Sequence, residues 1–370
     1  MALGYTQHKL QAPQDVETAV NFLNKNPFVA VDTEFVRRST YYPQFALLQM
    51  ASSTESFVLD PTRFSNLDSL KALFSNQNSV KVIHSSRQDI EIFIHHFNLI
   101  PFPIADTQIL AEFCGFEENI SLQELCYSFF GIHLSKEFQC LNWIKRPLPK
   151  KAIAYALEDV EYTYHCYLFL KSLAENKYTW FQEEMVSLSD PKFYEETPEK
   201  LISKFKKSTS SLKRKQKKNL AAILLIRQRI AAFTNLLVKN VLSDQVCYEL
   251  CCFTASEIKV RLEADLSKNL GTLFRQQRQK NIRHQELSFN LHDIIEEGFF
   301  IVENFDPEVE VYSFKRTIFD AFQASVQHIA KAHEINQTLL ARSKDIKAHI
   351  TGKPSRVTKG WRYKLLKSVL

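Results

Sequence analysis

The chain has 370 residues, a net charge of +6, 45% apolar residues and 24% charged residues, which is typical of a globular protein of two or three domains. Its seven glycines form no Gly-rich phosphate loop, and its seven cysteines are odd in number and include no Cys-x-x-Cys pair. These features argue against a P-loop, a disulfide framework and a cysteine-based zinc site. No segment predicts a signal peptide or a membrane span, so we expect a cytoplasmic protein.

Charge is distributed unevenly along the chain. Residues 1–200 contain 17 basic and 25 acidic residues, a balance of −8, whereas residues 201–370 contain 30 and 16, a balance of +14. An acidic half followed by a basic half predicts a catalytic body with an appended region that binds a polyanion. The alternative is that the basic residues only make the surface more soluble.

The first half alternates between apolar runs of strand length and helical patterns. In chain order, we predict strands over Phe28–Phe35, Phe45–Ala51 and Ser56–Asp60, a helix over Leu67–Phe74, a strand over Val80–His84, and helices over Gln88–Phe97, Thr107–Phe113 (with Asp106 as its N-cap), from Ser121 onward and over Pro149–Leu170. The short links make the first three strands antiparallel neighbours. This order suits an α/β fold with a mixed sheet.

The second half predicts helices only, from about Asp190 onward. A run of lysine, arginine and serine over Lys204–Lys218 marks a plausible boundary. Two helical sets of similar size follow, which suggests a duplicated module. We therefore expect an α/β domain over residues 1–190 and small all-α domains over 205–290 and 291–370.

Two acidic residues stand two apart on the first predicted strand. Asp32 and Glu34 follow the apolar run Val29–Val31, and period 2 places both carboxylates on one face of the sheet. An unpaired charge on a buried strand is costly. The residues therefore favour metal ligation over a solvent-facing pair of acids.

Two further segments bring acids and a tyrosine out of apolar runs. Asp89 begins a helix just after a strand, a position that the helix dipole alone can explain. Tyr155 and Asp159 are four apart on a helix and share one face. Carboxylates from separate segments can together hold Mg²⁺, and two such ions can clamp a phosphodiester. The combination predicts metal-dependent phosphodiester cleavage.

Other residues are weaker candidates. We expect His84 to be a core histidine, and Gln49 is a candidate to hold a substrate group. The aromatic residues that are candidates to stack bases are Phe35, Tyr41, Tyr42 and Trp143.

Together, these segments resemble the DEDD 3′–5′ exonucleases of the branch with tyrosine in the third motif, and within it the bacterial ribonuclease D family. The motif residues are Asp32 and Glu34, then Asp89, then Tyr155 and Asp159. The longer similar segments are Phe35–Gln44, Ala105–Gln108, Trp143–Leu148 and Tyr155–Val160, and, in two helical HRDC-like copies, Ile226–Asp244 and Leu339–Asp345 with Gly360–Arg362. One departure is Leu141-Asn142, where the family has a hydroxyl residue and an acid, so contacts to the substrate strand there are expected to differ.

The resemblance implies a ribonuclease-H-like α/β exonuclease domain and hydrolysis of RNA from its 3′ end, with release of 5′-mononucleotides. Precursors of tRNA are the expected substrates of a monomeric enzyme that has no membrane partner. The implied cofactors are two Mg²⁺ or Mn²⁺ ions. Asp32 would bridge them, Glu34 and Asp159 would complete the shell of the first, Asp89 would hold the second, and Tyr155 would orient the attacking water.

Two alternatives stay open at this point. A proofreading-type DNA exonuclease uses the same four acids, although the paired helical domains weigh against it. A non-catalytic nucleic-acid-binding module would have purely structural acids, although the shared faces of Asp32 with Glu34 and of Tyr155 with Asp159 weigh against it.

Overall fold

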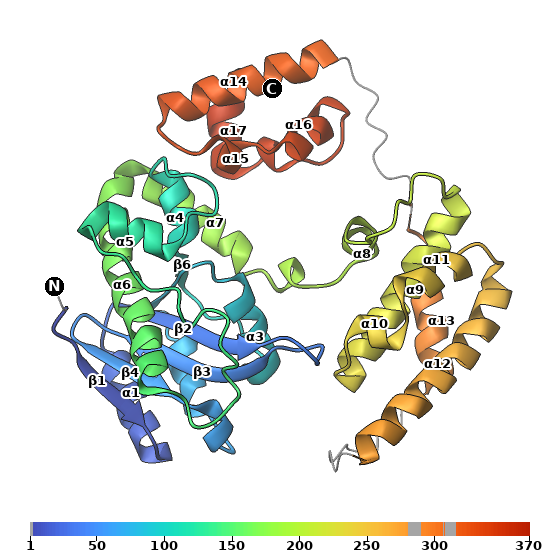
Figure 1. Ribbon diagram of the computed structural model, residues 1–370. Helices are drawn as coiled ribbons and strands as arrows, with labels where there is room; N and C mark the ends of the chain where they lie inside the picture. The colour runs from blue at the N-terminus through green and yellow to red at the C-terminus, as the bar shows by residue number, and fades with distance from the viewer. Residues whose placement is uncertain (1–2, 280–289, 306, 308–315) are drawn as a thin grey trace. The chain divides into compact units, whose positions relative to one another are not determined.

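The structure is a computed structural model (Figure 1). It describes residues 3–279, 290–305, 307 and 316–370. None of the helices in these ranges is both long and apolar enough to span a membrane.

The chain folds into two compact units, each built from segments that are separate in the sequence. The first unit comprises Met1–Val36, Gln44–Tyr194 and Tyr312–Leu370, and the second comprises Arg37–Pro43 and Glu195–Val311.

A six-stranded mixed sheet is the centre of the first unit, in the order β1-β4-β3-β2-β5-β6 (Figure 1). The strands are β1 (Thr6–Leu10), β2 (Phe28–Val36), β3 (Gln44–Ala51), β4 (Glu55–Leu59), β5 (Val80–Ile83) and β6 (Ile104–Asp106). The pairs β2–β3 and β3–β4 are antiparallel, and β1–β4, β2–β5 and β5–β6 are parallel. The predicted α/β class with a mixed sheet is confirmed.

Helices cover both faces of this sheet. On one face, α1 (Pro13–Leu23), α2 (Ser69–Phe74) and α3 (Arg87–Phe97) bury apolar side chains against Val31 of β2. The other face packs against the long helix α6 (Lys150–Ala174), where Val160 and Tyr164 meet small residues of β2 and β3. Because side chains alternate along a strand, each residue of β2 faces either α6 or the opposite helices.

The sequence patterns missed several elements of the first unit, among them α7 (Tyr178–Leu188), which follows the last helix predicted for this half of the chain. Strand β1 is mostly polar and lies at one end of the sheet, so no apolar alternation marks it. Helix α1 was not predicted, and the three-residue β6 is too short to give a pattern. The remaining elements up to residue 203 are η1 (Pro61–Arg63), α4 (Thr107–Phe113), α5 (Leu122–Phe130), η2 (Glu175–Lys177), η3 (Pro191–Phe193) and α8 (Pro198–Ser203).

The last helical set belongs to the first unit and shares its hydrophobic core. It consists of α14 (Arg316–Ala332), α15 (Gln337–Leu340), α16 (Ser343–Ile350), η4 (Arg356–Thr358) and α17 (Gly360–Leu366). Trp361 is 1% exposed and stacks on Trp180 of α7, with ring centroids 5.7 Å apart, while its ring also packs against Phe113 of α4 at 5.1 Å. This set therefore contributes to the same core as the sheet and its helices.

Two neighbouring glutamates of α7 fasten α17. The Glu183 carboxylate accepts the backbone N–H of Trp361 at 2.8 Å, and Gly360, with φ +55°, leaves room for that carboxylate. The Glu184 carboxylate pairs with Arg362 at 2.8 Å. Since both acids meet the first turn of α17, the helix dipole also favours them there.

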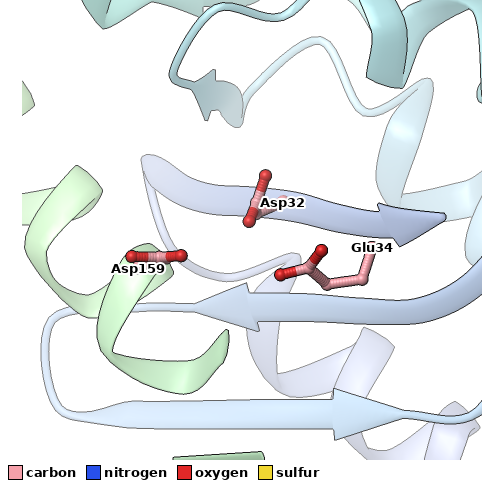
Figure 2. A group of neighbouring side chains, drawn as sticks. All are labelled: Asp32, Glu34 and Asp159. Carbon is pink, nitrogen blue, oxygen red and sulfur yellow. The ribbon is translucent and has the colours of Figure 1, made fainter. Parts of the chain in front are cut away.

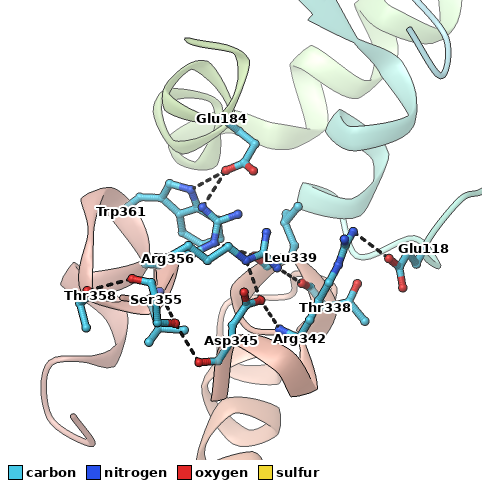
Figure 3. A network of polar contacts seen from close by, with 12 residues as sticks. Glu118, Glu184, Thr338, Leu339, Arg342, Asp345, Ser355, Arg356, Thr358 and Trp361 are labelled. Carbon is cyan, nitrogen blue, oxygen red and sulfur yellow. Dashed lines mark hydrogen bonds and ion pairs between the residues drawn. The ribbon is translucent and has the colours of Figure 1, made fainter. Parts of the chain in front are cut away.

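A second set of polar contacts holds the other turns of this helical set (Figure 3). Arg356 pairs with the buried Asp345 at 2.7 Å and donates to the carbonyl of Thr338. Arg342 pairs with Glu118 at 3.0 Å. The buried Asp345 carboxylate is thus paired and hydrogen-bonded, as a charge in a protein interior needs to be, whereas the Arg342–Glu118 pair is exposed.

The second unit is helical, with α8, α9 (Arg214–Thr234), α10 (Val238–Val241), α11 (Asp244–Leu250), α12 (Ala255–Gln279) and α13 (Leu291–Ile301). Gly298 of α13 packs so closely on Ile226 of α9 that a Cβ there would overlap the isoleucine side chain. The Tyr41 hydroxyl of the β2–β3 connection accepts a hydrogen bond from Gln228 at 2.7 Å. Helix α13 thus packs on α9 within the second unit. The predicted boundary between two helical domains at residue 291 stays a prediction.

Candidate active site

Two acidic side chains leave β2 on the face that α6 covers. Asp32 and Glu34 alternate with Val31, which is buried against the helices of the opposite face. The two acids therefore project from the same face, as the sequence spacing indicates. The register of the β2–β3 pair shifts between Glu34 and Phe35, and such an irregularity bends a strand directly after the second acid.

A third acid comes from α6. Asp159 lies one turn after Tyr155, on the side of the helix that packs on the sheet. Oxygen atoms of Asp32, Glu34 and Asp159 all lie within 4.8 Å of one another. Figure 2 shows the three carboxylate groups pointing into one common space between β2 and α6.

The pKa values of these three carboxyl groups are raised. Burial raises the pKa of Asp32 to about 8, and the charge of Asp159 adds to the effect. Burial and the charge of Asp32 raise the pKa of Glu34 to about 10. Burial raises the pKa of Asp159 to about 7, although a hydrogen bond from the Tyr155 hydroxyl acts in the opposite direction. The cluster is therefore short of positive charge at neutral pH.

A divalent cation fits this cluster chemically. Hard cations such as Mg²⁺ and Mn²⁺ prefer oxygen ligands, and three carboxylates supply them within one small space. The Asp159 Oδ1 atom is buried and has no hydrogen-bond partner among the residues that the structure describes, so it is available as a ligand. A bound cation would also offset the mutual repulsion that raises the pKa values.

Asp89, the fourth predicted acid, lies beside this cluster but is not one of its three members. It stands in the first turn of α3, is 5% exposed, and accepts a hydrogen bond from the Thr33 hydroxyl at 2.5 Å. Burial, followed by the charge of Asp32, raises its pKa well above the ordinary value. The charges of Asp89 and Asp32 repel each other, and the charge of Asp89 contributes to the raised pKa of Glu34. The hydrogen bond from Thr33 fixes one oxygen of the Asp89 carboxylate.

Tyr155 is held between two aromatic residues of the segment before α6. Its ring lies 5.9 Å from that of Phe138 and 6.4 Å from that of Trp143, and the tyrosine is 8% exposed. Burial and the charges of Asp159 and Glu34 raise the pKa of its hydroxyl, so the phenol stays protonated. The hydroxyl can therefore act as a donor beside the carboxylates.

Trp143 does not serve as a base-stacking platform, contrary to the expectation from sequence. Its side chain is 1% exposed and belongs to a small core with Tyr155. Arg146 fixes this segment by a bidentate ion pair with Asp60 at 2.6 and 2.8 Å and by a 2.8 Å hydrogen bond to the carbonyl of Ala46. Phe35 is only partly buried where it packs against the core of the first unit, so stacking remains a prediction for Phe35, Tyr41 and Tyr42.

A polar pocket of about 260 Å³ opens beside the acids. His84, expected to be a core residue, lines this pocket together with Asp32 and Asp159, and its Nδ1 lies 2.8 Å from the Thr107 hydroxyl. The lining amides that the sequence reasoning missed are Gln108, Asn119, Gln123 and Gln139. They come from separate loops and helices, so no spacing in the sequence could have joined them.

Asp106, by contrast, is the helix cap that the sequence predicted. Its carboxylate accepts hydrogen bonds from the backbone N–H groups of Gln108, Ser85 and Ser86. It thereby connects the start of α4 to the turn that precedes α3, and so helps to place Asp89.

The mixed sheet with a carboxylate cluster between β2 and α6 is the arrangement of a nuclease, and residues 7–175 match a family model described as a 3′–5′ exonuclease. Similarity to individual proteins identifies which family of 3′–5′ exonucleases this chain resembles. The chain is 30% identical over 360 residues to ribonuclease D of Bartonella henselae, covering 95% of this chain and 86% of that protein. It is likewise 30% identical to ribonuclease D of Jannaschia sp., covering 91% and 87%. The chain belongs to the ribonuclease D family and is a 3′–5′ exoribonuclease.

Solved structures agree with this fold. The crystal structure of Escherichia coli ribonuclease D superposes with a TM-score of 0.74 over 99% of this chain and 97% of that one, at 22% identity. The catalytic core of RRP6 from Trypanosoma brucei has a TM-score of 0.54 over 82% of this chain and 80% of that one, at 20% identity. Exonucleases of this class depend on divalent metal ions, and the acidic cluster is where this chain offers ligands for one.

Proposed function

We propose that Asp32, Glu34, Asp89, Tyr155 and Asp159 form the active site and that it uses two Mg²⁺ or Mn²⁺ ions. The grouping of Asp32, Glu34 and Asp159 within 4.8 Å supports the first cation position. Asp89, held by Thr33 beside the cluster, would hold the second, and Asp32 would be shared by both. When bound, the cations supply an activated water and charge stabilisation for the leaving 3′ oxygen.

The residues of the chain have distinct tasks in this proposal. Asp32, Glu34 and Asp159 stay ionised by sharing the cation charge, in place of the protons that their raised pKa values would otherwise retain. The Tyr155 hydroxyl orients the attacking water, because its ring is fixed by Phe138 and Trp143 and its proton is retained. Attack in line with the last phosphodiester would release 5′-mononucleotides one at a time.

We propose precursors of tRNA as the substrates. The basic excess of residues 201–370 supports contact with RNA phosphates, which is a salt-sensitive kind of binding. Two exposed lysines of the second unit lie at the start of α9, Lys213 as its N-cap and Lys215 in its first turn. A monomeric, cytoplasmic enzyme is the form in which we expect this activity.

The test compares wild-type protein with Asp32→Ala on a tRNA that carries extra 3′ nucleotides and on DNA of the same sequence, with Mg²⁺, with Mn²⁺ and with chelator. Stepwise shortening of the RNA that needs metal and is reduced on the order of 10³-fold in the variant is expected, since metal stabilisation is worth several kcal/mol. An Asp32→Ala rate equal to wild type would overturn the site. Shortening of DNA alone would favour a proofreading-type exonuclease.

A further inference from the structure

Gln49 is a polar residue buried beneath α6, next to the acidic cluster. On β3 it stands directly opposite Asp32 of β2, and on its other side it pairs with Val58 of β4. Directly opposite residues of an antiparallel pair project from the same face, with Cβ atoms about 4.5–5.5 Å apart. The side chain of Gln49 therefore shares with Asp32 the face of the sheet that α6 covers.

Both polar atoms of the Gln49 amide lack a hydrogen-bond partner among the described residues, and the side chain is 0% exposed. A buried polar group without a partner destabilises a protein, because it loses its hydrogen bonds to water and gains none in return. Unpaired groups of this kind in native proteins call for an explanation, such as a catalytic role or an absent ion or water. Asp159 Oδ1, on the helix above, is also without a partner in the described part of the chain.

Two simpler roles do not account for an amide at this position. Direct contact with substrate, the role considered for Gln49 from the sequence, needs an exposed side chain, and this one has no exposed surface. Packing alone needs no polar group, since Leu47 and Ala51, which flank Gln49 on the same face of β3, are apolar. The remaining explanation is that the Gln49 amide hydrogen-bonds a polar group inside the protein, and the neighbouring candidates are the carboxylates of the acidic cluster.

We propose that Gln49 is a positioning residue for the cation site, with its amide NH₂ donating a hydrogen bond to the Asp32 carboxylate when the cation is bound. The inference rests on the proposed metal site. Carboxylates that bind a metal are themselves oriented by hydrogen bonds from the surrounding protein. An amide donates without charge, so it orients Asp32 without competing with the cation as a lysine would.

This role predicts effects of opposite sign on the metal-free and metal-bound protein. Gln49→Met keeps the volume of the side chain and removes its unpaired polar atoms, so the metal-free thermal midpoint should be equal to or above that of wild type. The affinity for Mn²⁺, measured from the rise in midpoint with Mn²⁺ concentration, should fall about 10–100-fold. At low Mn²⁺ the kcat should fall by a similar factor, with little change in KM for RNA.

Ser56→Ala is the matched control. Ser56 is buried on the same face of the sheet, but its hydroxyl donates to Glu161 of α6 at 2.6 Å and does not neighbour the cluster ligands across the β2–β3 pair. This variant should lower the metal-free midpoint and leave the Mn²⁺ affinity unchanged. Gln49→Leu repeats the test if the methionine variant does not fold. If neither folds, the amide NH₂ signals of Gln49 in the wild-type NMR spectrum should shift on addition of Mg²⁺.

Several outcomes would overturn the inference. One is a Gln49→Met protein that binds Mn²⁺ as tightly as wild type, and another is a set of Gln49 amide signals that Mg²⁺ leaves in place. A metal-free Gln49→Met protein that is strongly destabilised but binds Mn²⁺ normally would assign Gln49 a structural role. If wild-type protein itself shows no Mn²⁺-dependent stabilisation, the proposed metal site fails, which is a different result.

Discussion

Glu184 and Arg362 form an ion pair at 2.8 Å that joins α7, beside the nuclease sheet, to the final helix α17. Their side chains are only 19% and 8% exposed. Burial alone would raise the pKa of Glu184, but the hydrogen bond and charge of Arg362, together with Arg356 and Trp361, leave that pKa below its ordinary value. The two residues are 178 positions apart in the sequence, so this contact joins parts of the first unit that residues 195–311 of the second unit separate in the chain.

Removing one partner of this pair should destabilise the protein strongly. Glu184→Gln leaves Arg362 buried without a counter-charge, which typically costs about 3–5 kcal/mol in the free energy of unfolding. Urea unfolding measures the loss. Replacing both residues with apolar ones, Glu184→Leu with Arg362→Met, should restore much of the stability. A single variant within about 0.5 kcal/mol of wild type would show that the pair is not needed.

The stability of the metal-free protein should fall as the pH rises. Burial is the first cause that raises the pKa of Asp32 from 3.8 to about 8, of Glu34 from 4.5 to about 10 and of Asp159 from 3.8 to about 7. Between the ordinary and the raised pKa values the folded protein binds more protons than the unfolded chain, so each such group lowers the stability by up to about 1.4 kcal/mol per pH unit. The loss begins near pH 4–5 and continues to about pH 8–10.

Thermal denaturation from pH 5 to pH 9, with chelator and with saturating Mn²⁺, checks this expectation. The cation should flatten the decline, because it replaces protons that the carboxyl groups would otherwise keep. Asp32→Asn removes one titrating group and should also give a shallower decline with chelator. Parallel profiles with and without Mn²⁺ would contradict a cation site at these acids.

Tyr155→Phe should slow the chemical step without disturbing the fold. The ring that packs between Phe138 and Trp143 is kept, whereas the hydroxyl that hydrogen-bonds Asp159 is lost. A positioned proton donor or acceptor typically contributes 10²–10⁴-fold to a rate, so we expect kcat to fall within that range and KM to stay nearly constant.

Single-turnover cleavage of a short RNA is the suitable measurement for Tyr155→Phe. Tyr162→Phe provides the control, because Tyr162 is another buried tyrosine of α6 but packs into the core on the side of α5. Equal rates for the two variants would refute a specific role for the Tyr155 hydroxyl.

The basic start of α9 should strengthen RNA binding through phosphate contacts. The double variant Lys213→Gln, Lys215→Gln removes two exposed positive charges from the second unit. For single-stranded RNA, each lost contact lowers the slope of log affinity against log salt by about 0.7, so a change of about 1.4 is expected. The double variant Lys9→Gln, Lys25→Gln removes two exposed lysines of the first unit and should leave the slope unchanged.

Substitution is a sharper test of RNA binding than deletion. Deletion of residues 201–370 would remove positive charge, but it would also remove Trp361 and its contact with Trp180 and so expose the core of the first unit. A loss of RNA binding could then come from either change. If the two lysine pairs change the salt slope equally, the start of α9 is not an RNA contact.

Local spacing predicted the parts of the site that are local. Period 2 placed Asp32 with Glu34, and a spacing of four placed Tyr155 with Asp159 on the face of α6 that packs on the sheet. That these two pairs meet follows from the packing of α6 on β2 and β3, which the family resemblance implied but no spacing required.

Tertiary packing decided what the sequence could not reveal. A tryptophan near an active site is equally suited to stacking a base or filling a core, and the tertiary packing of Trp143 in a small core with Tyr155 is what buries it. The unpaired amide of Gln49 depends on the strand register and on the helix above it. The core shared by Trp361 and Phe113 joins residues that are 248 positions apart, beyond the reach of any local pattern.

The discontinuity of the first unit has a consequence for biosynthesis. Chains leave the ribosome in sequence order, and domains generally fold as units, the N-terminal one first. Here Glu183 and Glu184 emerge before the whole of residues 195–311, and their partners in α17 only afterwards. Until α17 is synthesised, the apolar surface of α4 and α7 that Trp361 covers stays exposed to solvent or is bound by a chaperone. Every proposed catalytic residue has already been synthesised by that point.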